Sequence, residues 1–245
     1  MGPLDIEMQV DRLVVQCSLM KKLCRRHGFS GCVAAFPVSR WRRSYAYKFK
    51  VVKERCGVWG VRADIVPSGE RIPLALVRKA RQYVELLSVR ATNRKVAAFA
   101  ARDRRVDIVT LIPGVSPPLF RGDERYLDER GKLAEIRVSD IVVGGNRLET
   151  ARRLYDARRL LSGRSIKEKV ILSSGGNNAY SPRDPRDLVA FGHLFLDLDP
   201  AMLRTAMSNV LVGVVETNRA KLAGYHVVEG VWIEGKEEVS DNLEE

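Results

Sequence analysis

Long apolar runs are absent from this sequence, and with them the usual mark of a membrane protein. No stretch approaches the about 18 consecutive apolar residues that a membrane-spanning helix needs. The first residues also lack the charged-then-apolar order of a secretion signal. The hydrophobic fraction of 45% is nevertheless sufficient for a core. Together these features predict a soluble protein of the cytoplasm.

Cysteine and histidine are scarce, which argues against a metal centre. The four cysteines (Cys17, Cys24, Cys32 and Cys56) contain no Cys-x-x-Cys pair. The three histidines (His27, His193 and His226) are scattered, whereas a metal-dependent barrel hydrolase needs clustered histidines and carboxylates. We therefore predict buried structural thiols, no metal site and no intrinsic cofactor.

Two common catalytic motifs are also missing. Neither Gly-x-Ser-x-Gly nor Gly-x-x-x-x-Gly-Lys-[Ser/Thr] occurs. No pair of carboxylates and no lysine base stands out at the ends of the predicted strands. We predict no catalytic residue in this chain.

Acidic residues are outnumbered, so the net charge is +12, carried by 30 Arg and 12 Lys. Excess positive charge favours polyanions through counterion release, and the guanidinium fork suits phosphate. Arginine richness with only three glutamines is also typical of proteins from hot environments. Both causes are compatible with the composition, and the charge favours nucleic-acid binding by a modest margin.

Strand-like and helix-like segments alternate along the chain, which predicts an α/β protein with a mostly parallel sheet. The predicted strands cover residues 4–10, 31–36, 58–66, 84–89, 106–112, 133–138 and the apolar run that begins at 170. The predicted helices cover residues 13–24, 72–83, 92–101, 123–131, 146–161, 185–194, 200–207 and 210–223. Seven or more strands in this length fit one TIM-type barrel, residues 1–228. Residues 229–245 hold seven acidic residues and one basic residue, which predicts a flexible tail.

Residues 40–55 combine seven basic residues with aromatic residues at every second position. Tyr45, Tyr47, Phe49 and Val51 alternate with shorter or charged residues, which is typical of the buried face of a strand. We predict a strand or hairpin here, with its aromatics in the core and some of its cations in contact with nucleic acid.

The helix over 146–161 has a capping box, with Asn146 at its N-cap and Glu149 three residues later. Its pattern predicts an inward face made of five residues (Leu148, Ala151, Leu154, Tyr155 and Leu161). A second N-cap is predicted at Thr92.

The segment 170–192 places a short apolar strand, a polar Ser/Gly/Asn loop and a capped helix in succession. Asp184 is a good N-cap and Pro185 a good first helical residue, while Arg183 and Arg186 lie beside them. This arrangement is typical of a site for an anion or a partner, and equally of an ordinary strand-to-helix connection.

The same segment resembles a known family. Ser173-Ser174, Arg183-x-Pro185-x-Asp187-Leu188-x-x-x-Gly192 and Ala206-x-Ser208 resemble the C-terminal signature of the archaeal ribonuclease P protein component 3 family. That family is the counterpart of the thirty-kilodalton protein subunit of eukaryotic ribonuclease P. The close likeness covers about residues 133–210. Upstream only the order of elements and fragments such as Ile6-Glu7-Met8 agree, and Gln9 and Leu211 depart from the expected acidic residue and proline.

The resemblance implies an irregular TIM-type barrel with extra C-terminal helices and an RNA-binding subunit of ribonuclease P. In that family the RNA subunit cleaves precursor tRNA at its 5′ end, and Mg²⁺ serves that RNA. The implied partners are ribonuclease P RNA, precursor tRNA and a small protein subunit in a hetero-oligomer.

The resemblance also implies which residues contact RNA and which shape the signature loop. Arg183 is the first candidate for an RNA contact. Weaker candidates, chosen because they lie near the ends of predicted strands, are Arg186, Arg90, Arg94, Lys95, Arg137 and Lys169. Ser173 and Ser174 are expected to shape the loop, Pro185 to start the helix, and Asp187 to orient Arg183 or cap that helix. The alternative is a TIM-barrel enzyme that binds a small phosphorylated substrate through the Ser173–Gly176 loop.

Overall fold

The computed structural model describes residues 19, 22, 25–29, 31–142, 146–175, 183–224, 226–228 and 231–232. The predicted strand over 4–10 lies outside the described residues, as do most of the predicted helix over 13–24 and every acidic residue of the predicted tail. Gly28 has φ +81°, a left-handed value that favours glycine.

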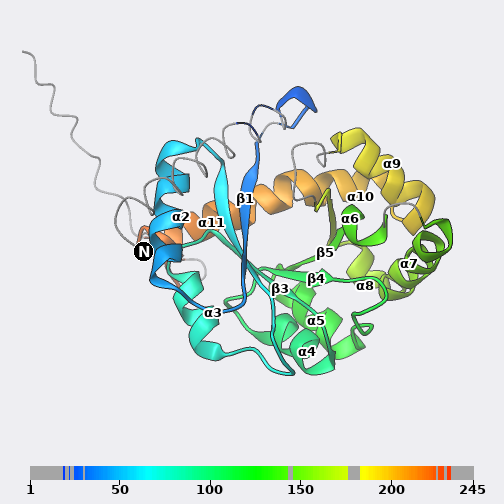
Figure 1. Ribbon diagram of the computed structural model, residues 1–245, viewed down its shortest axis with the longest axis horizontal. Coiled ribbons are helices and arrows are strands. Elements are labelled where there is room, and N and C mark those ends of the chain that lie inside the picture. Colours follow the sequence, from blue (N-terminus) through cyan, green and yellow to red (C-terminus); the bar gives the residue numbers. More distant parts are fainter. Residues whose placement is uncertain are drawn as a thin grey trace, which may run out of the picture.

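Six parallel strands form one sheet in the order of the sequence (Figure 1). They are β1 (Val33–Val38), β2 (Gly60–Ile65), β3 (Leu86–Arg90), β4 (Ile108–Leu111), β5 (Leu133–Arg137) and β6 (Val170–Ser173). A separate antiparallel pair joins β7 (His226–Val228) to β8 (Val231–Trp232). Among the described residues β1 and β6 do not pair with each other, so the sheet is an open half-barrel. The prediction of a barrel with seven or more strands is therefore wrong for this part of the chain, while the α/β, TIM-like arrangement is confirmed.

Helices follow the strands as the alternation predicts. They are α2 (Arg43–Arg55), α3 (Leu74–Arg81), α4 (Arg94–Arg102), α5 (Arg121–Glu129), α6 (Val138–Ile141), α7 (Arg147–Leu160), α8 (Arg164–Lys167) and α9 (Pro185–Leu196). Strand residues such as Val61, Ala63 and Ile65 are fully buried in the large core that these helices share with the sheet. In the described part of the chain no helix is both long and apolar enough to span a membrane.

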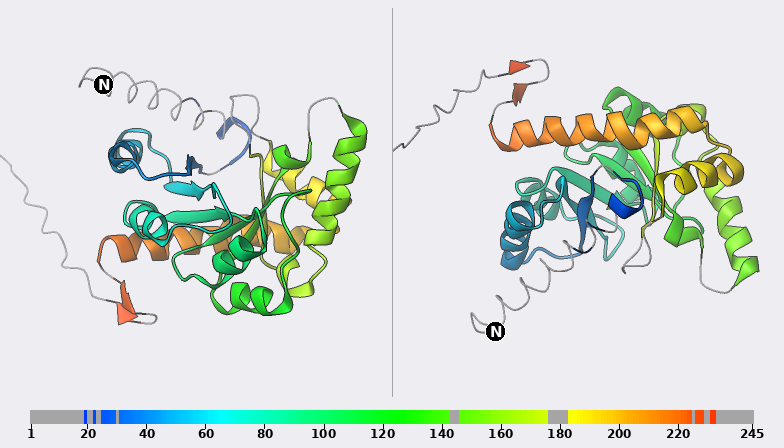
Figure 2. Two further views of the ribbon diagram at one scale, coloured as in Figure 1. Left: turned by 60° about the horizontal axis from the view of Figure 1, so that its bottom comes forward. Right: turned by 90° about the horizontal axis from the view of Figure 1, so that it is seen from above.

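One long helical stretch packs against the sheet at the starts of its strands. It comprises α10 (Pro200–Thr205), a π-helical turn (Ala206–Val210) and α11 (Leu211–Leu222), without the break that the sequence predicts between residues 207 and 210. Figure 2 shows it running along one side of the sheet. Leu86, Ile108 and Leu133, each the first residue of its strand, pack in one cluster with Val215 of α11. The helix therefore covers the starts of the strands and leaves their carboxyl ends to polar residues.

Residues 43–55 are helical, so the predicted strand or hairpin over 40–55 is wrong. Tyr45, Phe49 and Val52 recur at i, i+4 and i+7, and Phe49 and Val52 are fully buried. Tyr45 and Phe49 belong to the set of alternating residues, and they are also four residues apart, which is a helical spacing. Lysine, arginine and glutamate are also good helix formers, and neither glycine nor proline interrupts the segment.

The inward face predicted for α7 is also partly wrong. Leu148 is 63% exposed and Tyr155 is 69% exposed, whereas Ala157 and Leu160 are buried. The Asn146 cap is confirmed, because its side chain accepts a hydrogen bond from the Glu149 N–H at 3.1 Å. At α4 the cap is Asn93, which accepts from the Val96 N–H, and not Thr92.

Candidate nucleic-acid interface

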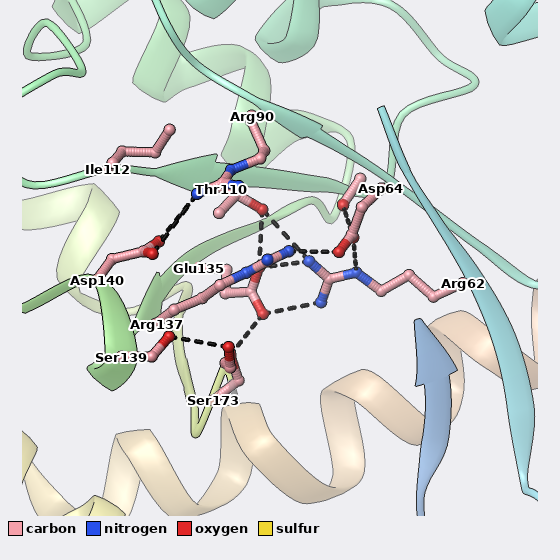
Figure 3. Close-up of polar contacts among 12 residues, drawn as sticks. Arg62, Asp64, Arg90, Thr110, Ile112, Glu135, Arg137, Ser139, Asp140 and Ser173 are labelled. Atoms are coloured by element: carbon pink, nitrogen blue, oxygen red, sulfur yellow. Dashed lines mark hydrogen bonds and ion pairs between the residues drawn. The ribbon is translucent and has the colours of Figure 1, made fainter. Parts of the chain in front are cut away.

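The carboxyl ends of the strands carry a layer of polar side chains that point into the half-barrel (Figure 3). Arg62 of β2 donates from Nη1 to Glu135 Oε1 of β5 at 2.8 Å and from Nε to Asp64 Oδ1 at 2.5 Å. Thr110 of β4 donates to Glu135 Oε2 at 2.7 Å. Arg137 reaches back across the sheet to Asp64 Oδ2 at 2.5 Å. Side chains from β2, β4 and β5 are thus joined in one hydrogen-bonded network.

Charges within this network balance. Burial opposes ionisation of Glu135, but the Arg62 guanidinium outweighs it and holds the pKa of that carboxyl well below its usual range. Burial likewise opposes the charge on Arg62, and the Glu135 and Asp64 carboxylates outweigh it, which raises the pKa of Arg62. The residues Arg62, Asp64 and Glu135 are all buried. Buried ions that satisfy one another in this way fix geometry and leave little charge for a ligand.

The network extends into the loop after β6. Ser173 donates from Oγ to Glu135 Oε1 at 2.8 Å. Ser174 Oγ accepts the backbone N–H of Arg183 at 2.8 Å. Ser139 Oγ donates to the Gly175 carbonyl at 2.9 Å, and Gly175 has φ +65°, where a side chain would collide with Ser139. The backbone on either side of the loop is therefore held against the ends of β5 and β6.

The signature residues have clear structural roles. Asp184 accepts the Arg186 N–H at 2.8 Å, with Pro185 as the first residue of α9, so the helix is capped by Asp184. A Cβ at Gly192 would lie 2.5 Å from Leu203 Cδ2 and 3.0 Å from Leu172 Cδ1. Glycine thus lets α9 approach β6 and α10 closely. Asp187 is exposed in the first turn of α9, where a carboxylate suits the helix dipole.

The seven cations predicted to contact RNA fall into two groups. Five have a carboxylate partner within the protein: Arg90 with Asp140, Arg94 with Asp123, Lys95 with Glu70, Arg137 with Asp64 and Lys169 with Asp128. Arg183 and Arg186 are exposed, and neither side chain forms an ion pair with another described residue. Lys169 also precedes β6, at the opposite end of the strand from Ser173. The structure thus brings Ser173, Ser174, Arg137 and Arg183 together and leaves Lys169 and Lys95 apart from them.

Sequence reasoning missed Arg62, Asp64 and Glu135. Their signal was present, because each is a charged residue inside an otherwise apolar strand: Val61-Arg62-Ala63-Asp64-Ile65 and Leu133-Ala134-Glu135-Ile136. Charges at alternate positions of a buried strand indicate a polar layer on one face of the sheet. The partners of these charges, however, lie on strands far away in sequence.

Two further predictions concern metal and thiol chemistry. Within the described ranges no group of three or more His, Cys, Asp or Glu side chains is arranged to hold a metal ion. Cys56 is buried and Cys32 is half-buried, and neither forms a disulfide. Cys17 and Cys24 lie outside the described residues.

The fold and the site define the class of protein. It is a TIM-like α/β protein whose strand ends carry paired charges and whose neighbouring segment, at the start of α9, presents exposed arginines. A family model described as RNase P subunit p30 matches residues 21–223, so the chain belongs to the RNase P subunit p30 family. This confirms the resemblance inferred from the signature and the role of a ribonuclease P protein subunit in tRNA processing.

Two further comparisons were made, with curated proteins and with solved structures. No curated protein matches the chain. One similar solved structure is the cryo-EM structure of archaeal Ribonuclease P with mature tRNA. A chain of that complex superposes with a TM-score of 0.66 at 19% identity, over 90% of this chain and 95% of that chain. At this identity the likeness shows a shared fold.

Proposed function

We propose that the chain is an RNA-binding subunit of ribonuclease P that supports cleavage of precursor tRNA through the β6–α9 loop. The observation that carries the proposal is the contrast between two sets of arginines at one edge of the sheet. Arg62 is buried and Arg137 is half-buried, and carboxylates neutralise both, whereas Arg183 and Arg186 are exposed beside them. The first set, through Glu135, holds Ser173 at the end of β6, and the second set is available to phosphates.

The physical role follows from the charge on RNA. A folded RNA needs phosphate neutralisation wherever its strands approach one another, and guanidinium groups provide it with defined geometry. The Arg183 backbone is fixed by Ser174, so binding RNA orders only its side chain. Catalysis stays with the RNA subunit, Mg²⁺ serves that RNA, and no cofactor of this chain is required. The remaining parts of the proposal are a small protein subunit as a partner in a hetero-oligomer and a cytoplasmic location.

Reconstitution tests the proposal. The full chain is combined with ribonuclease P RNA and the partner subunit, and cleavage of precursor tRNA is measured across salt concentrations. Arg183→Ala should lower cleavage most strongly at high salt, leave the melting temperature nearly unchanged and reduce the salt slope of RNA binding by about one. Arg125→Ala, which removes an 80% exposed arginine on α5, is the matched control and should cleave like the wild type. Equal cleavage by Arg183→Ala and wild type at every salt concentration would remove Arg183 from the interface.

The second candidate, an enzyme that grips a phosphorylated metabolite with residues 173–176, is less well supported. Ser173 Oγ already donates to Glu135, and Ser174 Oγ accepts from Arg183. Purification separates the two functions: an RNA-binding subunit should release RNA at high salt, whereas the enzyme should retain a small phosphate ester.

A further inference from the structure

A second basic surface lies where the start of α2 meets the end of α3, on the other side of the molecule from α9 (Figure 1). Trp41, just before α2, stacks on Tyr83, just after α3, with ring centroids 5.4 Å apart and planes at 27°. The Tyr45 ring lies 6.1 Å from Trp41 on the inner side, toward the buried Phe49. Tyr83 remains 38% exposed, so the aromatic stack reaches from the core to the surface.

Five exposed cations lie close to Trp41 or Tyr83 in sequence. Arg40, Arg42 and Arg43 flank Trp41, and Arg78 and Lys79 lie in the last turn of α3. Lys79 precedes Tyr83 by four residues, about one helical turn. None of the five side chains forms an ion pair or hydrogen bond with another residue that the structure describes. They form a positive surface interleaved with aromatic rings.

Helix stability does not account for the cations at the start of α2. At the start of α2 the helix dipole favours carboxylates, yet Arg42 is the N-cap residue, Arg43 follows it and the first turn has no acidic residue. At the end of α3 a cation is favourable, but Arg81 already provides one and is held by Asp107 at 2.5 Å. Residues that violate local folding preferences without an internal partner are typical of functional surfaces.

We propose that this surface binds a single-stranded or looped segment of RNA, with Arg40, Arg42, Arg43 and Lys79 on phosphates and an unstacked base against Tyr83. Aromatic rings between cations suit single strands because every base has a face that can stack. This inference rests on the proposed function and adds a second contact, so that RNA is held at two separate points of the half-barrel.

Binding of a ten-nucleotide oligouridine and of an RNA duplex of ten base pairs to the full chain tests the surface, by fluorescence anisotropy over a range of salt concentrations. Arg42→Gln/Arg43→Gln should reduce the salt slope for the single strand by about 1.4, since each single-strand phosphate contact contributes about 0.7. Tyr83→Leu should weaken binding of the single strand about tenfold without changing its salt slope, and should leave binding of the duplex unchanged. The control Arg104→Gln/Arg125→Gln removes the same charge from exposed positions on the α4–α5 side and should change neither quantity.

Each other outcome is decisive. If the control weakens binding as much as Arg42→Gln/Arg43→Gln, only net charge matters and the surface is refuted. Unchanged single-strand affinity in Tyr83→Leu refutes the stacking. If both α2–α3 variants bind like wild type while Arg183→Ala is impaired, this inference fails and the proposed function stands. If the wild type ignores RNA even at low salt, both fail. Wild type and the α2–α3 variants are also titrated separately with ribonuclease P RNA and with precursor tRNA. The variants should bind more weakly only to the RNA that supplies the segment.

Discussion

The arginines of α4–α5 and those of α2–α3 differ in what surrounds them. On the α4–α5 side Arg94 and Arg102 share the fully buried Asp123, and the Arg94 guanidinium lies 3.3 Å from the centre of the Phe120 ring. At the start of α2, Arg40, Arg42 and Arg43 have no carboxylate partner among the described residues. A net charge of +12 therefore hides two populations, one that holds the fold together and one that remains available to a polyanion.

The largest effect is expected inside the sheet, where Glu135 neutralises two arginines of the structural population. Glu135→Gln should lower the free energy of unfolding by about 3 to 5 kcal/mol, because Arg62 keeps its charge and loses its main buried partner. Ser173→Ala, which removes one hydrogen bond to the same carboxylate, should lower it by only about 1 kcal/mol. Urea denaturation measures both, and similar small losses would show that the network is not structural.

Lys132 extends the comparison to a buried cation that forms no ion pair with a carboxylate in the described part of the chain. Its Nζ donates to the carbonyls of Ala100 and Asp103 at 2.8 and 2.6 Å, and burial lowers the pKa of Lys132 to about 7. Above that pH the unfolded chain still holds the proton and the folded protein does not. The free energy of unfolding should therefore rise between about pH 7 and 10.

The variant Lys132→Met isolates the contribution of Lys132 to the pH dependence of stability. Lys132→Met should gain stability relative to wild type by about 2 to 4 kcal/mol as the pH falls from 10 to 7. Denaturation of both proteins at these two pH values measures the difference. A stability difference that is independent of pH would mean that Lys132 keeps an ordinary pKa.

A substitution at Asp123 tests the arginines that hold the fold together. Asp123→Asn should lower the free energy of unfolding by about 1 to 3 kcal/mol, because charge-assisted hydrogen bonds to Arg94 and Arg102 are lost. RNA affinity should be preserved or slightly raised, since two guanidinium groups become free. Thermal denaturation and anisotropy measure the two effects, and a loss of RNA affinity with unchanged stability would contradict the division into populations.

The smallest effect is expected on α2. Arg43→Gln should raise the free energy of unfolding by a few tenths of a kcal/mol, because a cation is removed from the positive end of the helix dipole. The same variant should bind single-stranded RNA more weakly. Lower stability in this variant would indicate that Arg43 supports the fold instead.

Much of the fold was predictable because its signals are local. The Asn146 and Asp184 caps, Pro185 and the apolar strand cores act within a few residues, and the structure confirms them. The errors arose where the local signal was ambiguous: Tyr45 and Phe49 fit both a strand and a helix, and only burial against the sheet selects the helix. Leu148 and Tyr155 fit an inward face that the packing of α7 leaves exposed.

The sequence by itself determined the alternation of strands and helices, the excess of arginine and the signature around Arg183, because propensity, charge and motif are properties of neighbouring residues. Only the tertiary structure decided which arginines are neutralised. Arg62 meets Glu135 across 73 positions of sequence, and Arg94 meets Asp123 across 29. Such partners are chosen by the register of parallel strands and the packing of helices, and a single sequence does not record either.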